Sequence, residues 1–206
     1  MSDYLVQRLG HVTLEVSDLE RAVAEFTTTG QLELAEARDN EVFLRGDMHH
    51  YWLRLVELLH AVFLVPDVPG TAAFYEDVLG FRVSDWTERV AAFMRCGNEY
   101  HHSLALLQAQ GQAGAFHHYA MLCEEFDDVM VARQDALTSK TELAEDLVRH
   151  GPSGSAGVYL RSPLGFSYEF CVWHDRITDP GHQPRILPAA RSTVNVWELP
   201  RDRAGI

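Results

Sequence analysis

Histidines are the residues of this chain with the clearest potential for chemistry. Eleven of the 206 residues are histidine, and two adjacent pairs occur in GNEYHHS (Gly97–Ser103) and AFHHYAM (Ala115–Met121). A neutral imidazole can ligate a transition metal, and an imidazole that titrates near neutral pH can act as an acid or a base. The simpler alternative is that neighbouring histidines alternate between the two faces of a strand and have no chemical role. The strands and helices that carry the two pairs determine which of these possibilities applies.

An internal repeat organises these histidines. Three segments align with one another: HVTLEVSDLERAVAEF from His11, HAVFLVPDVPGTAAFY from His60 and HYAMLCEEFDDVMVAR from His118. Each begins with histidine and a short apolar run, which is typical of a half-buried strand. An acid that could cap a following helix comes seven residues after each histidine: Asp18, Asp67 and Glu125. The second halves also repeat, with strands expected to begin at FLR (43–45), FMR (93–95) and YLR (159–161).

The repeat predicts an α+β fold built from β-α-β-β-β modules. We place the modules at about 10–57, 58–110 and 115–173, with Gly-rich connections between and within them. The tail contains four of the eight prolines and is expected to be extended, with one possible strand at STVNVWEL (192–199). The predicted domains are therefore a single module in residues 1–57, a two-module domain in 58–175 and a tail in 176–206.

Composition disfavours several classes of partner and location. The net charge of −13 opposes binding to nucleic acid or to an anionic membrane. The chain has no run of 18 apolar residues, and its first ten residues lack the pattern of a signal peptide. Its three widely spaced cysteines suit reduced thiols better than a disulfide framework or a zinc site. We expect a cytoplasmic protein that binds neither nucleic acid nor membrane.

Several segments together resemble one family. HAVFLVPDVPGTAAFYEDVLGF, FMRCGNEYHHSLALL, HHYAML and RSPLGFSYEF are similar to the catalytic modules of type I extradiol dioxygenases of the vicinal oxygen chelate superfamily. The resemblance covers most of residues 8–175. It implies modules paired into an open barrel, and cleavage of a catechol-type ring with O₂ to a hydroxymuconic semialdehyde-type product. Family members usually have four modules in two domains, whereas this chain has only three.

A metal site follows from the repeat and the resemblance together. His60 and His118 begin equivalent strands of adjacent modules, so they are expected side by side in one barrel. His118 fits the repeat better than His117, because the residue eight positions later is then the apolar Phe126. By resemblance, Glu169 completes the ligand set His60, His118 and Glu169. Two histidines and one carboxylate are the ligands of non-haem Fe(II) oxygenases, and Mn(II) suits the same ligands.

The resemblance also implies three catalytic residues. His102 matches the family's acid/base histidine, with His101 as the alternative if the strand register shifts by one residue. His150 lies nineteen residues before Glu169, and Tyr159 lies ten residues before it; both spacings match the family. The residues after His150 are Gly-Pro-Ser, where many members carry Asn-Asp, so the substrate contacts of this loop differ.

Two other functions are alternatives to a dioxygenase: a non-catalytic binding protein and a glyoxalase-like isomerase. A non-catalytic protein that binds an aromatic compound or antibiotic would usually lack the ligand set. A glyoxalase-like isomerase would use a second Glu near the end of module two, where HHSLALLQ has no acid.

A single module exposes strand edges and an apolar face. Module one is therefore expected to pair with its copy in a homodimer or a higher even oligomer, or else to cover its own barrel as a lid.

Overall fold

The computed structural model describes residues 19–30, 32–38, 41–45, 55–110 and 114–198. Module one contributes α1 (Leu19–Thr28), β1 (Glu33–Arg38) and β2 (Glu41–Arg45). The second repeat contains β3 (Leu55–Val65), α2 (Val68–Leu79), β4 (Arg82–Thr87), β5 (Ala91–Arg95) and β6 (Leu104–Gln108). The third contains β7 (Ala115–Cys123), α3 (Phe126–Ser139), β8 (Leu143–Arg149), β9 (Ala156–Arg161) and β10 (Ser167–Val172). The tail forms β11 (Arg185–Leu187), α4 (Arg191–Val194) and a 3₁₀ turn at Val196–Glu198.

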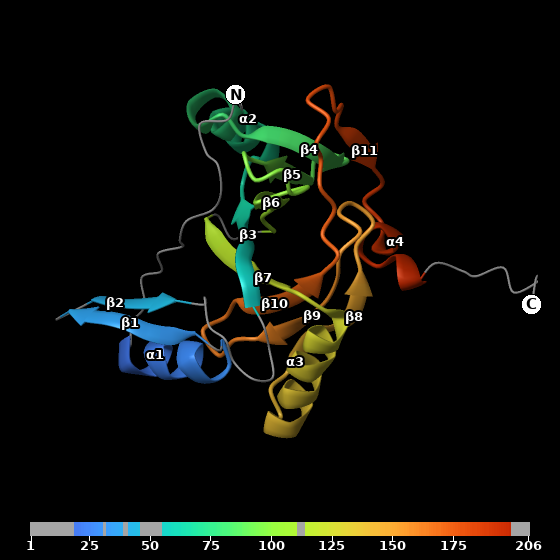
Figure 1. Cartoon of the computed structure of the whole chain (residues 1–206). Coiled ribbons are helices and arrows are strands. Elements are labelled where there is room, and N and C mark those ends of the chain that lie inside the picture. Colours follow the sequence, from blue (N-terminus) through green and yellow to red (C-terminus); the bar gives the residue numbers. More distant parts are fainter. Residues whose placement is uncertain (1–18, 31, 39–40, 46–54, 111–113, 199–206) are drawn as a thin grey trace, which may run out of the picture.

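The main sheet joins two equivalent modules. Its nine strands have the order β11-β4-β5-β6-β3-β7-β10-β9-β8. In each module the first strand pairs in parallel with the last, as β3 does with β6 and β7 with β10. The two modules meet where β3 runs antiparallel to β7, and the sheet curves around this junction as an open barrel (Figure 1). The predicted fold class is therefore confirmed.

The helices begin where the repeat predicts. The side chain of Asp67 is the N-cap of α2 and accepts a hydrogen bond from the backbone N–H of Gly70. Gly80 ends this helix in the left-handed conformation that a glycine adopts without strain. Glu125 is the N-cap of α3 and forms a capping box with Asp128. The acid of the first repeat, Asp18, lies outside the described residues, as does His11.

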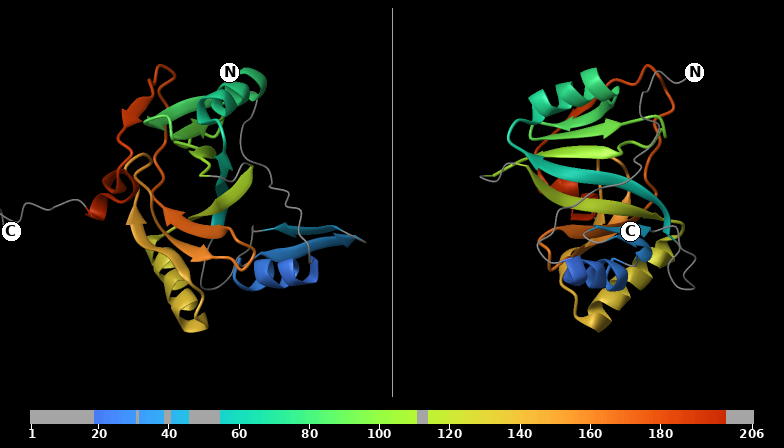
Figure 2. Two further views of the ribbon diagram at one scale, coloured as in Figure 1. Left: turned by 180° about the vertical axis from the view of Figure 1, so that it is seen from behind. Right: turned by 90° about the vertical axis from the view of Figure 1, so that its left-hand side faces the viewer.

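Strand alternation separates an outer face of the sheet from an inner one. On β7 and β10, Tyr119 and Tyr168 point outward, where they contact Phe26 of α1. The helices α1 and α3 lie on this outer side of the third module (Figure 2). His118 and Glu169 alternate with the two tyrosines and therefore point to the inner face. The described part of module one thus packs through α1 against the outer face of the third module.

The tail departs from the prediction. The described part of STVNVWEL, residues 192–198, forms no strand but lies in α4 and the 3₁₀ turn, which Asn195 joins. The reason is local: the side chain of Thr193 donates to the carbonyl of Pro188, and the side chain of Asn195 accepts from the backbone N–H of Trp197. Such side chain–backbone bonds compete with strand pairing. The strand of the tail is β11, which pairs in parallel with β4.

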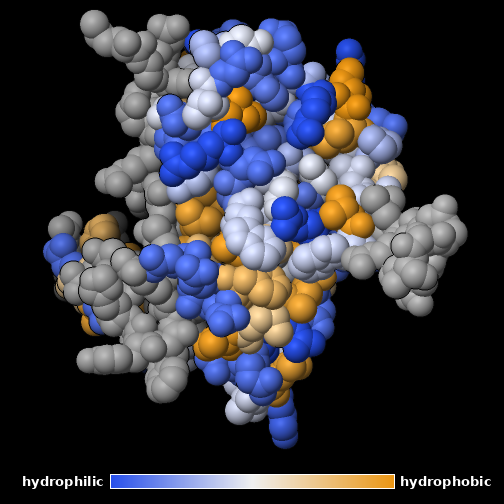
Figure 3. Space-filling model, turned by 45° about the vertical axis from the view of Figure 1, so that its right-hand side comes forward, coloured by the Kyte–Doolittle hydropathy of each residue, from blue (hydrophilic) through white to orange (hydrophobic). Residues whose placement is uncertain are grey.

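The surface is mixed in character. Figure 3 shows hydrophilic and hydrophobic residues interspersed on one face of the molecule. Of the helices in the described part of the chain, none combines the length and apolar character that crossing a membrane requires.

Candidate metal centre

Three adjacent strands bring the predicted ligands together. His60 on β3 and Glu169 on β10 both lie opposite Ala120 of the central strand β7. His118 precedes Ala120 by two residues, so it points to the same face. Ala120 is fully buried, and its methyl group leaves space above the strand. The local sequence therefore places two imidazoles and one carboxylate around a single point.

The three side chains converge through one atom each. Nε2 of His60 lies 3.0 Å from Oε2 of Glu169 and 3.3 Å from Nε2 of His118. Nε2 of His118 is 3.3 Å from the same Glu169 oxygen. Two ligands at about 2.1 Å from one ion and at right angles to each other would be about 3.0 Å apart. The triangle therefore has the dimensions of one face of an octahedral metal site.

The chemistry of these donors also fits a cation. All three side chains are buried, and neither oxygen of Glu169 has a hydrogen bond of normal geometry. Burial lowers the pKa of His118 to about 4, so this imidazole is neutral at pH 7. Burial would raise the pKa of Glu169, but the neighbouring imidazoles, His60 first, outweigh this effect and hold that pKa well below its usual value. A carboxylate and imidazole nitrogens that face one another are what a divalent metal requires.

The pair His101–His102 is divided between two environments. The His102 ring lies against His60, with centroids 4.3 Å apart, and it lines the cavity in front of the ligands. Burial lowers the pKa of His102 well below its usual value, assisted by the neighbouring imidazoles. His101 lies behind it, with Nε2 2.8 Å from Oδ2 of Asp85. Of the two, His102 is the one beside the candidate ligands.

His150 and Tyr159 form a second pair beside the ligands. Nδ1 of His150 donates to the carbonyl of Val194, at 2.8 Å, so in the neutral ring Nε2 is an acceptor. The hydroxyl of Tyr159, 2.8 Å from this Nε2, is therefore the donor. Burial and the nearby Glu169 raise the pKa of Tyr159 well above its usual value, which keeps the hydroxyl protonated. The same Nε2 is 3.6 Å from Oε1 of Glu169.

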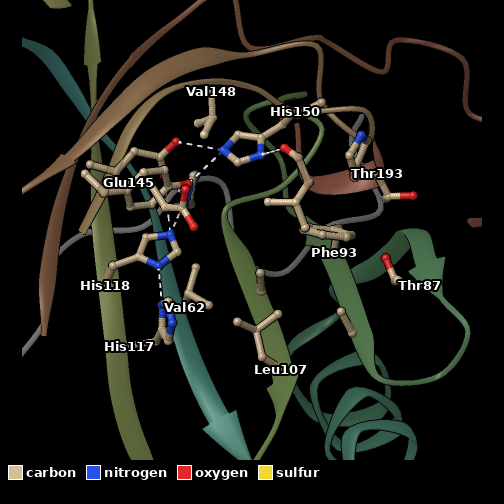
Figure 4. Close-up of a pocket in the computed structure, with 18 of the residues that line it drawn as sticks. Val62, Thr87, Phe93, Leu107, His117, His118, Glu145, Val148, His150 and Thr193 are labelled. Carbon is tan, nitrogen blue, oxygen red and sulfur yellow. Dashed lines mark hydrogen bonds and ion pairs between the residues drawn. The ribbon is translucent and has the colours of Figure 1, made fainter. Parts of the chain in front are cut away.

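A cavity of about 540 Å³ opens in front of these groups. Figure 4 shows His118 of β7 and His150, which follows the end of β8, pointing into it, with Val62, Phe93 and Leu107 along its walls. The tail closes another side through residues between Ala189 and Val194. Cavities of this size commonly bind small molecules.

Three contacts of the site were not predicted from sequence. His117 is not an inner ligand, but its Nδ1 lies 2.6 Å from Nδ1 of His118 and can orient that ring. His174 is buried beside His102, with ring centroids 4.6 Å apart. Val194 reaches His150 from the tail. The HH doublet at 117–118 was a visible signal for the first contact, whereas no sequence pattern indicated the other two.

The fold and the site together define the class of this protein. It is an α+β protein whose paired β-α-β-β-β modules form an open barrel. Two histidines and a carboxylate converge on the inner face of the barrel as a candidate metal site. The profile of the Glyoxalase/Bleomycin resistance protein/Dioxygenase superfamily matches residues 57–181, more than half of the chain. The chain belongs to this superfamily.

Several curated proteins that are similar to this chain are named as dioxygenases. The chain is 33% identical over 128 residues to "Biphenyl-2,3-diol 1,2-dioxygenase" of Paraburkholderia xenovorans (strain LB400), covering 58% of this chain and 42% of that protein. It is 30% identical over 144 residues to "3-methylcatechol 2,3-dioxygenase" of Pseudomonas putida, covering 60% and 48%. The chain thus matches less than half the length of these relatives.

Solved structures share the fold. The homoprotocatechuate 2,3-dioxygenase from Arthrobacter globiformis superposes with a TM-score of 0.66 at 25% identity, covering 79% of this chain and 52% of that one. The Mn(II)-bound glyoxalase from Novosphingobium aromaticivorans superposes with a TM-score of 0.67 at 22% identity, covering 89% and 68%. Both likenesses bear on the arrangement of modules.

Proposed function

We propose that the chain is an Fe(II)-dependent extradiol dioxygenase, which cleaves a catechol-type ring with O₂ to a hydroxymuconic semialdehyde-type product. The observation that carries this proposal is the convergence of His60, His118 and Glu169 at one wall of a largely apolar cavity. The dioxygenase names of the relatives support the same reaction type.

The ligands and the reaction suit one another. His60, His118 and Glu169 would hold the ion through one atom each. An Fe(II) ion bound by them would lower the pKa of a catechol hydroxyl and offer open positions to both catechol oxygens and O₂. Mn(II) is the alternative ion for the same donors.

Tyr159 and His150 are proposed to act on the substrate hydroxyls. Because Tyr159 is protonated and already donates to His150, the pair can exchange hydrogen bonds with a catechol oxygen without creating a buried charge. The carbonyl of Val194 holds the His150 ring in one tautomer while this occurs. These contacts orient the ring of the substrate relative to Glu169.

His102 is proposed to be the acid/base on the other side of the substrate. It lines the cavity and contacts the His60 ring, so it lies beside any molecule bound at the ligands. A neutral imidazole can accept a substrate proton and return it later to the developing product oxygen. The apolar residues around it, such as Phe93, exclude water from this transfer.

The experiment is anaerobic loading of the full chain with Fe(II), followed by a panel of catechols and air. Ring cleavage would appear as a yellow product band and as O₂ consumption with at least one catechol. An aromatic-binding protein without catalytic activity would bind catechols and consume no O₂. That result, with Fe(II) shown to be bound, would overturn the proposed reaction.

The assembly is a separate proposal. Module one covers the outer face of the third module through α1, while its strands β1 and β2 pair only with each other among the described residues. Leu34 on β1 is 54% exposed and Phe43 on β2 is 43% exposed. We propose that residues 1–57 pair with the same module of a second chain, and that residues 58–175 form the catalytic domain. Light scattering tests this, because a monomer of about the 23.3 kDa chain mass would contradict it.

A further inference from the structure

A chain of polar contacts runs from the half-exposed Arg185 of the tail to the buried His102. It consists of Arg185, Asp85, His101 and His102, which come from β11, β4 and the segment before β6. Within this chain, Asp85, His101 and His102 are all buried. Neither the ligand set nor the proposed substrate contacts use Asp85 or His101, so the burial of these two polar side chains has no explanation in the proposed function.

The tail fixes the position of Asp85. Arg185 lies opposite Asp85 in the parallel pairing of β11 with β4. Its backbone N–H and its Nε each donate to Oδ1 of Asp85 at 3.0 Å, and its terminal nitrogen contacts Oδ2. That nitrogen also donates to the carbonyl of Pro152 at 2.8 Å. Burial would raise the pKa of Asp85, but the hydrogen bonds from His101 and Arg185 lower it to about 2, so it is a carboxylate.

The carboxylate determines where the protons of His101 lie. An ionised carboxylate only accepts hydrogen bonds, so Nε2 of His101, 2.8 Å from Oδ2, must carry a proton. Arg185 already balances the charge of Asp85. A second cation at His101, which is 2% exposed, would therefore be a buried charge without compensation. In a ring whose single proton is held on Nε2 by Asp85, Nδ1 of His101 is an acceptor.

The proton position of His101 in turn determines that of His102. Nδ1 of His102 lies 3.0 Å from Nδ1 of His101, and two acceptors at this distance would repel each other. We propose that Asp85 and His101 are positioning residues, which hold His102 with its proton on Nδ1 and its lone pair on Nε2, the nitrogen left to face the cavity. This inference rests on the proposed function, in which His102 first accepts a substrate proton.

Asp85→Asn should move the ring proton of both His101 and His102 to the other nitrogen of each ring. The amide oxygen would occupy the Oδ1 position, where it accepts from the backbone N–H and Nε of Arg185. The terminal nitrogen of Arg185, which contacts Oδ2 in the wild type, would turn from the amide NH₂ and keep its bond to the carbonyl of Pro152. The amide NH₂ would then face Nε2 of His101, which becomes an acceptor. His101 would carry its proton on Nδ1 and donate to His102, whose Nε2 would be protonated and no longer a base.

The first test is the tautomer of His102, read from long-range ¹H–¹⁵N spectra of the full chain in its metal-free and Zn(II)-loaded forms. The signals are assigned by their loss in His102→Asn. The wild type should carry the His102 proton on Nδ1, and Asp85→Asn should carry it on Nε2. A wild-type His102 protonated on Nε2 would overturn the inference, and this reading needs no folded variant at position 85.

The second test is kinetic. Asp85→Asn should lower kcat by about 10²-fold or more with little change in KM, because substrate binding is kept while the base is lost. Asp146→Asn is the matched control: it removes an exposed carboxylate, also paired to an arginine, on the outer side. An active wild type with unchanged kcat in Asp85→Asn would refute the positioning role. An inactive Fe(II)-loaded wild type would refute the proposed reaction instead, and the tautomer measurement would still decide this inference.

Discussion

Replacing Glu169 by Gln tests the candidate metal centre directly. The substitution preserves the volume of a fully buried side chain and removes the negative charge at the point where two imidazole nitrogens converge. If Glu169 is a ligand, the variant should bind a divalent metal much more weakly, because an amide oxygen is a poorer donor and leaves the charge of the ion less compensated.

The expected size follows from linkage. At a metal concentration 100 times its dissociation constant, binding stabilises the folded chain by about 2.7 kcal/mol. For a chain of this length that corresponds to a rise in melting temperature of about 5–11 °C. Loss of an outer contact to a ligand costs about 10–100-fold in affinity, so loss of a ligand should cost about 100-fold or more. At the same concentration the variant would then gain only about 0.4 kcal/mol, or about 1–2 °C.

The assay is thermal unfolding with and without Fe(II) under anaerobic conditions, each protein being compared with its own metal-free form. Glu142→Gln is the matched control, because Glu142 is exposed and lies 3.8 Å from Arg161 in a pair of little energetic value. The control should keep the full metal-induced shift. A full shift in Glu169→Gln would refute the assignment of Glu169 as a ligand.

Three further predictions follow from the same contacts. Tyr159→Phe removes the hydroxyl that donates to His150 and should lower kcat of ring cleavage by about 10²-fold at similar KM; steady-state kinetics with unchanged kcat would contradict this role. All three cysteines are buried, and burial raises the pKa of the Cys123 thiol to about 12, so a thiol reagent should label none in the native chain and all three in urea; rapid native labelling would contradict this burial. Because the pKa of His118 falls from 6.5 to about 4 on folding, the unfolded metal-free chain binds more protons between these values, and its stability should decrease as the pH is lowered from 6.5 to 4, by up to about 1.4 kcal/mol per pH unit for this group. Urea unfolding with equal midpoints at pH 7 and pH 5 would exclude that effect.

The repeat made much of the fold predictable from sequence. The histidine that begins each strand, the acid seven residues later and the helix that follows are local patterns, and each is visible in a single alignment of the chain with itself. They placed α2 and α3 and their caps correctly. The same register selected His118 over His117, and the structure places Nε2 of His118 beside Glu169.

Contacts made by the tail could not be predicted in this way. Arg185 contacts Asp85 from the three-residue strand β11, and Val194 contacts His150 from the four-residue helix α4. Both elements are too short to leave a periodic pattern in the sequence. β-branched residues in STVNVWEL favoured a strand, but bonds from Thr193 and Asn195 to nearby backbone decided the local structure. The position of β11 is set by its tertiary pairing with β4, which lies about a hundred residues earlier.

The measurement that tests the central claim most directly is mass spectrometry of the product formed by the Fe(II)-loaded chain from a catechol under oxygen-18 gas. An extradiol dioxygenase inserts both atoms of one O₂ molecule, so we predict a ring-opened semialdehyde that carries oxygen-18 from the gas, with one O₂ consumed for each ring cleaved. A product without oxygen from the gas, or catechol returned intact by a chain shown to hold Fe(II), would contradict the account.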